Sequence, residues 1–235
     1  MKLKQIKSPN FNKVRRKIRF VIIHYTGMQS LRASLSRLTS KKHKVSSHYL
    51  ISRNGKIINL VDDNNVAWHA GKSKWKNFEN LNKTSIGIEL VNKGHQFGYQ
   101  NFSKQQILGL KKLCLFLKKK HKIKDNCFLG HSDIAPLRKK DPGERFPWGK
   151  LISKKVKFSL TKVNFNFLER KKIRNIFFKN LYKIGYRYFN VKKSSKSDKL
   201  VVKAFQRRYN PTNITGSIDK KTYIISAFLA KNSNY

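Results

Sequence analysis

The segment of residues 130–149, GHSDIAPLRKKDPGERFPWG, gathers side chains that could hold a metal ion. The chain has 11 Asp and Glu residues against 54 Lys and Arg, yet Asp133, Asp141 and Glu144 all lie in this segment. Prolines between and after His131 and Asp141 restrict φ, so a stiff loop could aim both side chains at one point. A hydrolytic zinc centre needs three protein ligands and one open position for water, so a third ligand must come from elsewhere in the chain.

The best candidate for that third ligand is His24, in the motif RFVIIHYTG. Residues 20–23 are β-branched and aromatic, and Gly27 ends the run, a pattern that predicts a buried strand. His24 would then lie at the end of this strand, where functional sites on sheets usually lie. The alternative is that His24 is a hydrogen-bonded core histidine and that His131 and Asp141 are ordinary polar groups of a loop.

Five motifs, in their order and at their spacing, resemble those of the zinc-dependent N-acetylmuramoyl-L-alanine amidases. They are VIIHYTG, SSHYLISRNGKI, AWHAG, TSIGIELVN and GHSDIAPLRKKDPG, and the resemblance spans roughly residues 15–150. The superfamily also includes phage lysozymes of the amidase type and the animal peptidoglycan recognition proteins. The resemblance implies an α+β fold with a mixed β-sheet flanked by helices. It also implies one zinc ion (Zn2+) per chain, held by His24, His131 and Asp141.

The same resemblance implies an activity on the bacterial cell wall. The enzyme would hydrolyse the amide bond between N-acetylmuramoyl, or 1,6-anhydro-N-acetylmuramoyl, residues and the L-alanine of the stem peptide, in peptidoglycan degradation or recycling. Peptidoglycan or muropeptides would be its partners. A non-catalytic peptidoglycan-recognition protein is the alternative, because it would share the fold. Such proteins usually lack a metal ligand, whereas His24, His131 and Asp141 are all present, which favours the enzyme.

Two further residues are candidates for the chemistry itself. Glu89 lies in the apolar half of the strand-like run TSIGIELV, where a carboxylate is costly unless it is paired or functional. The resemblance implies that Glu89 is the general base. Lys139 stands two residues before Asp141, and the family's Lys-x-Asp pattern implies that its cation stabilises the tetrahedral oxyanion.

The motif VAWHAG contributes candidates for substrate binding. Trp68 and His69 could be core residues, but an aromatic side chain next to a glycine-containing loop is also a natural platform for a sugar ring or a peptide. In the resembled family this motif borders the substrate cleft, so we expect Trp68 and His69 to bind substrate. His48 lies in a predicted strand and is expected to be a packed, hydrogen-bonded histidine. Because Ser47 precedes it, the tyrosine that acts as the base in some relatives is not indicated.

The composition indicates a folded and strongly basic protein. The formal net charge is +43, and 39% of the residues are hydrophobic. Such a charge favours association with polyanions, whether nucleic acid, anionic lipid or an acidic wall polymer, although a general lysine-rich bias would also produce it. We predict no specific nucleic-acid partner, because no aromatic–basic platform or helix-turn-helix signature is present in the sequence. The sequence carries no signal of oligomeric state.

The pattern changes along the chain and predicts four parts. Residues 1–18 form an extended basic arm, residues 19–154 the zinc amidase domain and residues 155–168 a basic linker. Residues 169–235 carry apolar side chains at three- and four-residue steps, typical of three short helices. The motifs AFQRRYN and TGSIDKKT resemble the small peptidoglycan-binding module often attached to wall hydrolases. A purely structural helical cap on the amidase is the alternative.

Local signals predict helices and a hairpin in the amidase domain. Ser30 and Ser103 each precede apolar residues at helical spacing and are candidate N-caps. The dipeptide Asn54-Gly55 lies between two strand-like runs and predicts a β-hairpin.

No targeting or membrane-spanning segment is indicated. The first 20 residues are basic but lack the apolar stretch of roughly 7 to 15 residues that a signal peptide needs. The sequence also contains no run of about 18 apolar residues, the length needed to span a membrane. We therefore expect a cytoplasmic protein. The alternative is a protein of the periplasm or cell envelope that is exported by a non-classical route. A cytoplasmic location favours anhydro-muropeptides as substrate, whereas a binding module favours the polymer.

Overall fold

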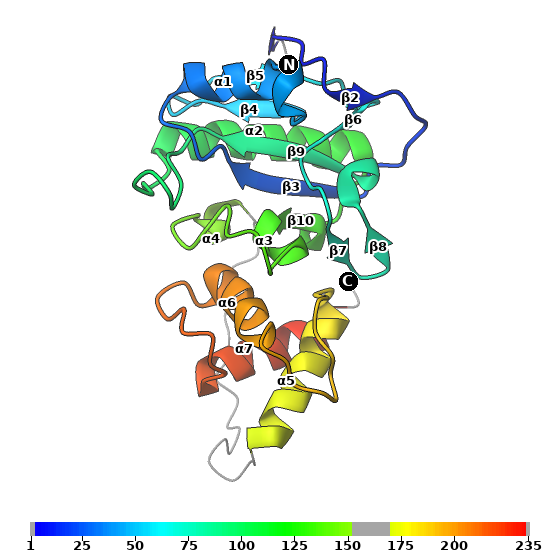
Figure 1. Ribbon diagram of the computed structural model, residues 1–235, viewed down its shortest axis with the longest axis vertical. Coiled ribbons are helices and arrows are strands. Elements are labelled where there is room, and N and C mark those ends of the chain that lie inside the picture. Colours follow the sequence, from blue (N-terminus) through cyan, green and yellow to red (C-terminus); the bar gives the residue numbers. More distant parts are fainter. Residues whose placement is uncertain (1–2, 152–169, 234–235) are drawn as a thin grey trace.

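The computed structural model describes residues 3–151 and 170–233 (Figure 1). Its central sheet has six strands, which in spatial order are β1 (Lys4–Gln5), β5 (Ile57–Asn59), β4 (Tyr49–Ile51), β9 (Ser85–Leu90), β3 (Phe20–Tyr25) and β10 (Phe128–Gly130). Within this sheet β4 and β5 are antiparallel and the other neighbours are parallel. The predicted α+β fold, a mixed sheet flanked by helices, is confirmed.

Two antiparallel pairs lie outside the central sheet. They are β2 (Phe11–Asn12) with β6 (Val66–Ala67), and β7 (Lys74–Trp75) with β8 (Phe78–Glu79). The predicted N-terminal arm is extended, but β1 and β2 join it to the sheet domain. Arg16, which is half-buried, donates hydrogen bonds to the carbonyl oxygens of Asn65 and Ser85. The N-terminal segment is therefore attached to the sheet domain through β1, β2 and Arg16.

Helices cover both faces of the central sheet. Alternate residues of a strand point to opposite faces. Val21 and Ile23 of β3 pack in a cluster with Leu113 of α2 (Lys104–His121), whereas Phe20 and Ile22 pack in a cluster with the C-terminal helices. On this second face α1 (Leu31–Thr39) covers β4 and β5. By the same alternation, His24, which lies two residues after Ile22 near the end of β3, presents its side chain to the second face.

The structure confirms the helix N-caps and the hairpin that local signals in the sequence predict. The Ser30 hydroxyl accepts the amide hydrogen of Ala33 at 3.1 Å, and the Ser103 hydroxyl accepts that of Gln106 at 3.1 Å, so both residues are N-caps. Gly55 has a φ of +83° in the turn between β4 and β5, a left-handed conformation that a tight hairpin requires and glycine adopts without strain.

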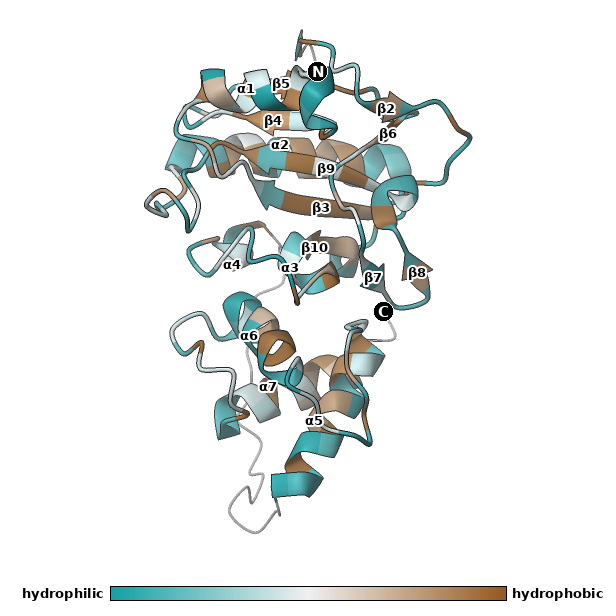
Figure 2. Cartoon of the chain, viewed as in Figure 1, coloured by the Kyte–Doolittle hydropathy of each residue, from teal (hydrophilic) through white to brown (hydrophobic). Residues whose placement is uncertain are grey.

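The described C-terminal part consists of α5 (Arg170–Ile184), α6 (Asp198–Tyr209) and α7 (Lys220–Lys231), which agrees with the three predicted helices. They lie beyond the β10 edge of the sheet (Figure 1) and share a hydrophobic core with it. Phe177 and Phe205, both 0% exposed, belong to one cluster with Phe20 and Ile22 of β3. The hydropathy colouring shows apolar residues both in the central strands and in these helices (Figure 2). The predicted linker, 155–168, lies outside the described residues.

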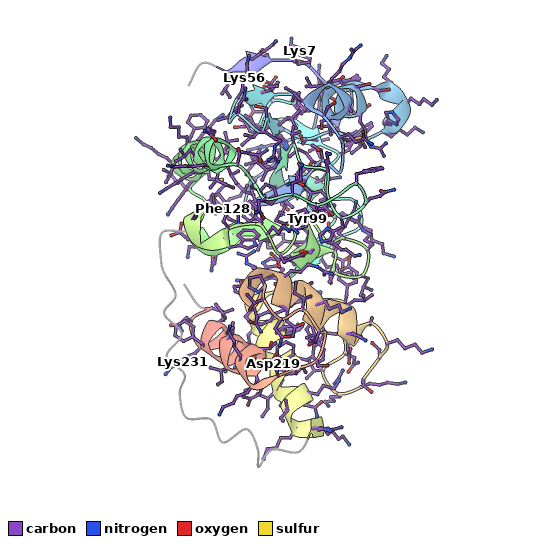
Figure 3. The ribbon with its side chains drawn as sticks, turned by 90° about the vertical axis from the view of Figure 1, so that its left-hand side faces the viewer. Lys7, Lys56, Tyr99, Phe128, Asp219 and Lys231 are labelled. Atoms are coloured by element: carbon purple, nitrogen blue, oxygen red, sulfur yellow. The ribbon has the colours of Figure 1, made fainter. Side chains whose placement is uncertain are left out.

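The junction between the two parts is visible from the side. Phe128 and Tyr99 lie at the end of the sheet domain nearest the C-terminal helices, whereas Lys7 and Lys56 lie at the opposite end (Figure 3). The remaining helical segments are η1 (Lys41–His43), η2 (Leu81–Thr84), η3 (Asp125–Cys127), α3 (His131–Ile134) and α4 (Trp148–Leu151). Within residues 3–151 and 170–233, no helix has the length and apolar character needed to cross a membrane.

Candidate metal centre

The three predicted metal ligands come together at one edge of the sheet. His24 lies near the C-terminal end of β3, and His131 follows β10 directly as the first residue of α3. Because β3 and β10 are parallel neighbours, their C-terminal ends meet at the same edge, where sites on such sheets are usually built. The loop returns Asp141 to this edge, and its carbonyl oxygen accepts the Ser132 amide hydrogen at 2.8 Å.

The three candidate ligand atoms form a tight triangle. Nδ1 of His24 lies 2.9 Å from Nδ1 of His131 and 3.0 Å from Oδ2 of Asp141, and the third side measures 3.1 Å. In a tetrahedral zinc site with bonds of about 2.0 to 2.1 Å, neighbouring ligand atoms lie about 3.3 Å apart. All three side chains are buried. Their spacing is therefore close to that of a metal site.

The hydrogen bonds made by Nε2 of His24 and by Nε2 of His131 leave Nδ1 of each ring with a free lone pair, which could bind a metal ion. Nε2 of His131 lies 3.1 Å from the carbonyl oxygen of Ala70, to which it can only donate. Nε2 of His24 lies 3.1 Å from Nδ1 of His69, and Nε2 of His69 lies 3.4 Å from Oγ of Ser85. When His69 directs its own N–H to Ser85, its Nδ1 accepts from His24. Partners of this kind fix the tautomer of a metal-binding histidine.

The electrostatics of the triangle suit a cation. Burial lowers the pKa of His24 to about 4, and the adjacent His131 adds to this effect. Burial alone would raise the pKa of Asp141, but His131 and His24 hold it below its ordinary value. At neutral pH a neutral His24 imidazole and an ionised Asp141 carboxylate thus direct acceptor atoms at the point where Nδ1 of His131 also lies. Two nitrogens and one oxygen form a donor set that suits zinc.

Glu89 lies beside this triangle. It is the Cα partner of His24 on the neighbouring strand β9. Its Oε2 is buried, and within residues 3–151 and 170–233 it has no hydrogen-bond partner. Burial, reinforced by repulsion from Asp141, raises the pKa of Glu89 to about 8, while Lys139 acts in the opposite direction. A carboxylate in this position can accept a proton from a nearby water molecule.

One cavity connects the predicted site residues. It has a volume of about 440 Å³, and every residue predicted for the site except Trp68 lines it. Glu89 and Lys139 lie in this lining together with the three candidate ligands. One cavity thus brings together a carboxylate that can accept a proton, a cation and three atoms that could bind a metal ion. Such an arrangement could hydrolyse a carbonyl compound.

Residues 14–144 match the family model described as N-acetylmuramoyl-L-alanine amidase. The chain belongs to this family. Among its curated relatives, the N-acetylmuramoyl-L-alanine amidase AmiD of Escherichia coli K12 is 36% identical over 91% of this chain and 82% of its own length. The 1,6-anhydro-N-acetylmuramyl-L-alanine amidase AmpD of Haemophilus influenzae is 34% identical over 64% of this chain and 90% of its own length.

Solved amidase structures share the architecture. The complex of E. coli AmiD with anhydro-N-acetylmuramic acid-L-Ala-D-gamma-Glu-L-Lys has a TM-score of 0.78 and 32% identity, and the likeness covers 93% of this chain and 91% of that one. AmpDh3 of Pseudomonas aeruginosa has a TM-score of 0.83 and 28% identity, with 94% of each chain covered. At this coverage, both likenesses include C-terminal helices in addition to the amidase domain.

Trp68 and His69, the two residues predicted to bind substrate, lie in different surroundings. Trp68 is half-buried and does not line the cavity; its indole N–H donates to Oδ1 of Asn12 at 2.6 Å. His69 lines the cavity, but its ring is hydrogen-bonded to His24. His48 is a packed, hydrogen-bonded histidine, as expected. His69 can therefore act on the metal centre through His24.

A chain of polar side chains beside the amidase cavity has only a weak signal in the sequence. The Tyr25 hydroxyl lies 2.8 Å from Nδ1 of His95, and Nε2 of His95 lies 3.2 Å from both carboxylate oxygens of Glu144. Arg207 of α6 lies 3.8 Å from the same carboxylate. Tyr25 follows the candidate ligand His24 in the sequence, and Glu144 lies in the segment of residues 130–149, where the scarce acidic residues gather. These positions could have indicated both residues. No motif of the metal centre contains His95 or Arg207.

Proposed function

We propose that this chain is a zinc-dependent hydrolase of the amide bond between N-acetylmuramoyl, or 1,6-anhydro-N-acetylmuramoyl, residues and the L-alanine of the stem peptide, in peptidoglycan degradation or recycling. The observation that carries the proposal is the buried triangle of donor atoms from His24, His131 and Asp141 beside Glu89. Family membership supports the identity of the bond. The complete ligand set favours an enzyme over a non-catalytic peptidoglycan-recognition protein.

One zinc ion per chain would be held by His24, His131 and Asp141. When bound, zinc supplies a water molecule whose pKa is lowered to about 7 and polarises the scissile carbonyl group. The protein's own contribution is to hold its ligands ready. His69 and the Ala70 carbonyl keep the two imidazoles in the tautomers that metal binding needs.

Glu89 is the proposed general base. Because its Oε2 has no donor among the described residues, this oxygen is available to take a proton from the attacking water and return it to the leaving amine. A raised pKa suits this role, since a base that titrates near neutral pH can both accept and release the proton. Lys139, in the same cavity, is proposed to stabilise the oxyanion of the tetrahedral intermediate.

The proposed substrates are peptidoglycan or muropeptides. A cavity of about 440 Å³ is large enough for part of a sugar and the start of its peptide. Residues 169–235 are proposed to help bring the enzyme to the polymer, as the peptidoglycan-binding modules they resemble do, because a tethered second site raises the effective concentration of substrate.

Digestion of two substrates tests the proposed function. The zinc-loaded protein is incubated with intact sacculi and, separately, with an anhydro-muropeptide, and the products are identified by mass. We expect free stem peptides that begin with L-alanine, and sugars that have lost their peptide. Cleavage within the peptide or between sugars would contradict the proposal. The relative rates on the two substrates distinguish wall degradation from recycling.

A further inference from the structure

The two arginines of the AFQRRYN motif reach from α6 into the loop that carries the metal ligands. Arg208 and Asp133 form an ion pair in which the side chains are 6% and 1% exposed. Asp133 lies two residues after the ligand His131. The neighbouring Arg207 lies 3.8 Å from Glu144, at the other end of the same loop. The C-terminal helices thus contact the loop at both ends.

Asp133 is the centre of a closed hydrogen-bond network. Its Oδ2 accepts the Gly130 amide hydrogen at 2.8 Å and a hydrogen bond from the Arg208 guanidinium, and its Oδ1 accepts the Tyr186 hydroxyl at 2.5 Å. Arg208 also donates to the Phe128 carbonyl oxygen at 2.9 Å. Two side chains of the C-terminal part therefore hold the backbone of Phe128 before the histidine ligand and the side chain of Asp133 after it.

The histidine ligand needs such support from outside its own element. α3, which His131 begins, has only four residues, and a single helical turn is not stable by itself. A buried ion pair whose hydrogen bonds are satisfied holds its groups in one geometry, because any displacement leaves a buried charge uncompensated. We propose that Arg208 and Tyr186 are positioning residues of the metal centre, so that α6 and the segment that follows α5 complete the catalytic unit. This inference rests on the proposed function.

Zinc affinity in three variants of the full chain tests the inference. Tyr186→Phe removes one hydroxyl donor and keeps the ring that packs against Trp75, with centroids 4.9 Å apart. Arg208→Lys keeps the charge but cannot form two directed hydrogen bonds of the same geometry. Arg174→Met is the matched control, since Arg174 forms a 2.7 Å ion pair with Asp198 within the same C-terminal part and its other hydrogen bonds go to Asn175 and to carbonyl oxygens of residues 190–193.

Competition with a chromophoric chelator measures the affinity, and the visible spectrum of the Co²⁺-substituted protein reports the geometry. We expect Tyr186→Phe and Arg208→Lys to bind zinc about 10-fold or more weakly, to change the Co²⁺ spectrum and to regain activity at saturating zinc. Arg174→Met should lower the Tm and leave both metal readouts unchanged.

Two results would overturn the inference. Wild-type zinc affinity and an unchanged Co²⁺ spectrum in Tyr186→Phe would show that the network stabilises the fold alone, and this variant remains informative even if Arg208→Lys does not fold. Failure of the unaltered protein to bind zinc would overturn the proposed function, and this inference with it. The wild-type measurement therefore separates the two failures.

Discussion

Each imidazole of the proposed metal centre presents one particular nitrogen to the triangle of candidate ligand atoms. His24 and His131 both use Nδ1, because Nε2 is engaged with His69 in one case and with the Ala70 carbonyl oxygen in the other. A metal ligand in the wrong tautomer would direct an N–H at the cation, so these outer partners support metal binding by the ligands. We therefore assign His69 to the proposed metal centre as the partner of His24.

His69→Phe tests that role. The change removes the acceptor for the His24 N–H and keeps an aromatic ring of similar size. We expect zinc affinity to fall about 10- to 100-fold, with little change in KM at saturating zinc, as measured by chelator competition and steady-state kinetics. A raised KM at unchanged zinc affinity would instead support the substrate-binding role predicted from the sequence. The same assays on Trp68→Phe test the substrate-binding role predicted for Trp68.

The carboxyl group of Glu89 gives the metal-free protein a characteristic pH dependence. Its pKa is about 8 in the folded chain, against an ordinary value of 4.5. Between these values the folded state binds more protons than the unfolded state, so the contribution of Glu89 to the free energy of unfolding falls as pH rises through this window. The Tm of the wild type relative to that of Glu89→Gln, measured with a chelator from about pH 5 to 8, should therefore fall with rising pH. A pH-independent difference would contradict this assignment.

The candidate ligands could be predicted from the sequence, whereas their supports could not. A histidine at the end of an apolar strand and scarce acids in a proline-bearing loop carry a local signal, and the resemblance to the amidase family singled out His24, His131 and Asp141, which the structure brings together. The network around Arg208 and Tyr186 joins residues more than 50 positions apart. In a chain with 54 Lys and Arg, no sequence pattern distinguishes an arginine that will be buried.

At the scale of elements, local chemistry predicts single strands and helices but not their neighbours. The β-branched run of β3, the N-caps of α1 and α2 and the glycine of the β4–β5 hairpin all act within a few residues. The pairing of β1 with β5 joins Lys4 to Ile58. Such a contact has no local signal, and for this reason the N-terminal segment looks like a separate arm in the sequence.

The close approach of β9 to His69 provides a test at this scale. A Cβ atom at Gly87 would lie 2.4 Å from Cγ of His69, so any larger residue must displace the ring. Gly87→Ala should therefore weaken zinc binding about as much as His69→Phe does, by about 10- to 100-fold. Gly149→Ala is the control, because a Cβ atom there meets nothing within 4 Å. Wild-type zinc affinity in Gly87→Ala would show that the ring can move without disturbing His24.

The whole molecule is held together by a core that crosses the boundary predicted from composition. Apolar periodicity reveals the C-terminal helices, but it does not say what their apolar faces cover. In the structure those faces contribute Phe177 and Phe205 to a cluster that includes Phe20 and Ile22 of the sheet. This supports the alternative of a structural helical cap, which is compatible with an additional role in binding the wall.

Removal of residues 170–235 tests how far the amidase domain depends on the helices. The truncation would expose the shared core and leave Asp133 without its cation, and loss of one partner of a buried ion pair alone costs about 3 to 5 kcal/mol. We expect thermal unfolding at much lower temperature and loss of cleavage of both sacculi and small muropeptides. Intact cleavage of muropeptides with weaker binding to sacculi would instead indicate an independent tethered module.

The central claim is that His24, His131 and Asp141 hold a zinc ion and that Glu89 acts as the base. Zinc content and turnover of an anhydro-muropeptide, measured on the same preparations of wild type, Glu89→Gln and Asp141→Ala, test it most directly. Glu89→Gln should keep about one zinc per chain and lose roughly 10²- to 10⁴-fold in kcat with a modest change in KM. Asp141→Ala should lose zinc and activity together. Near wild-type turnover in Glu89→Gln, loss of its zinc, or full activity of a verified metal-free wild type would contradict the account.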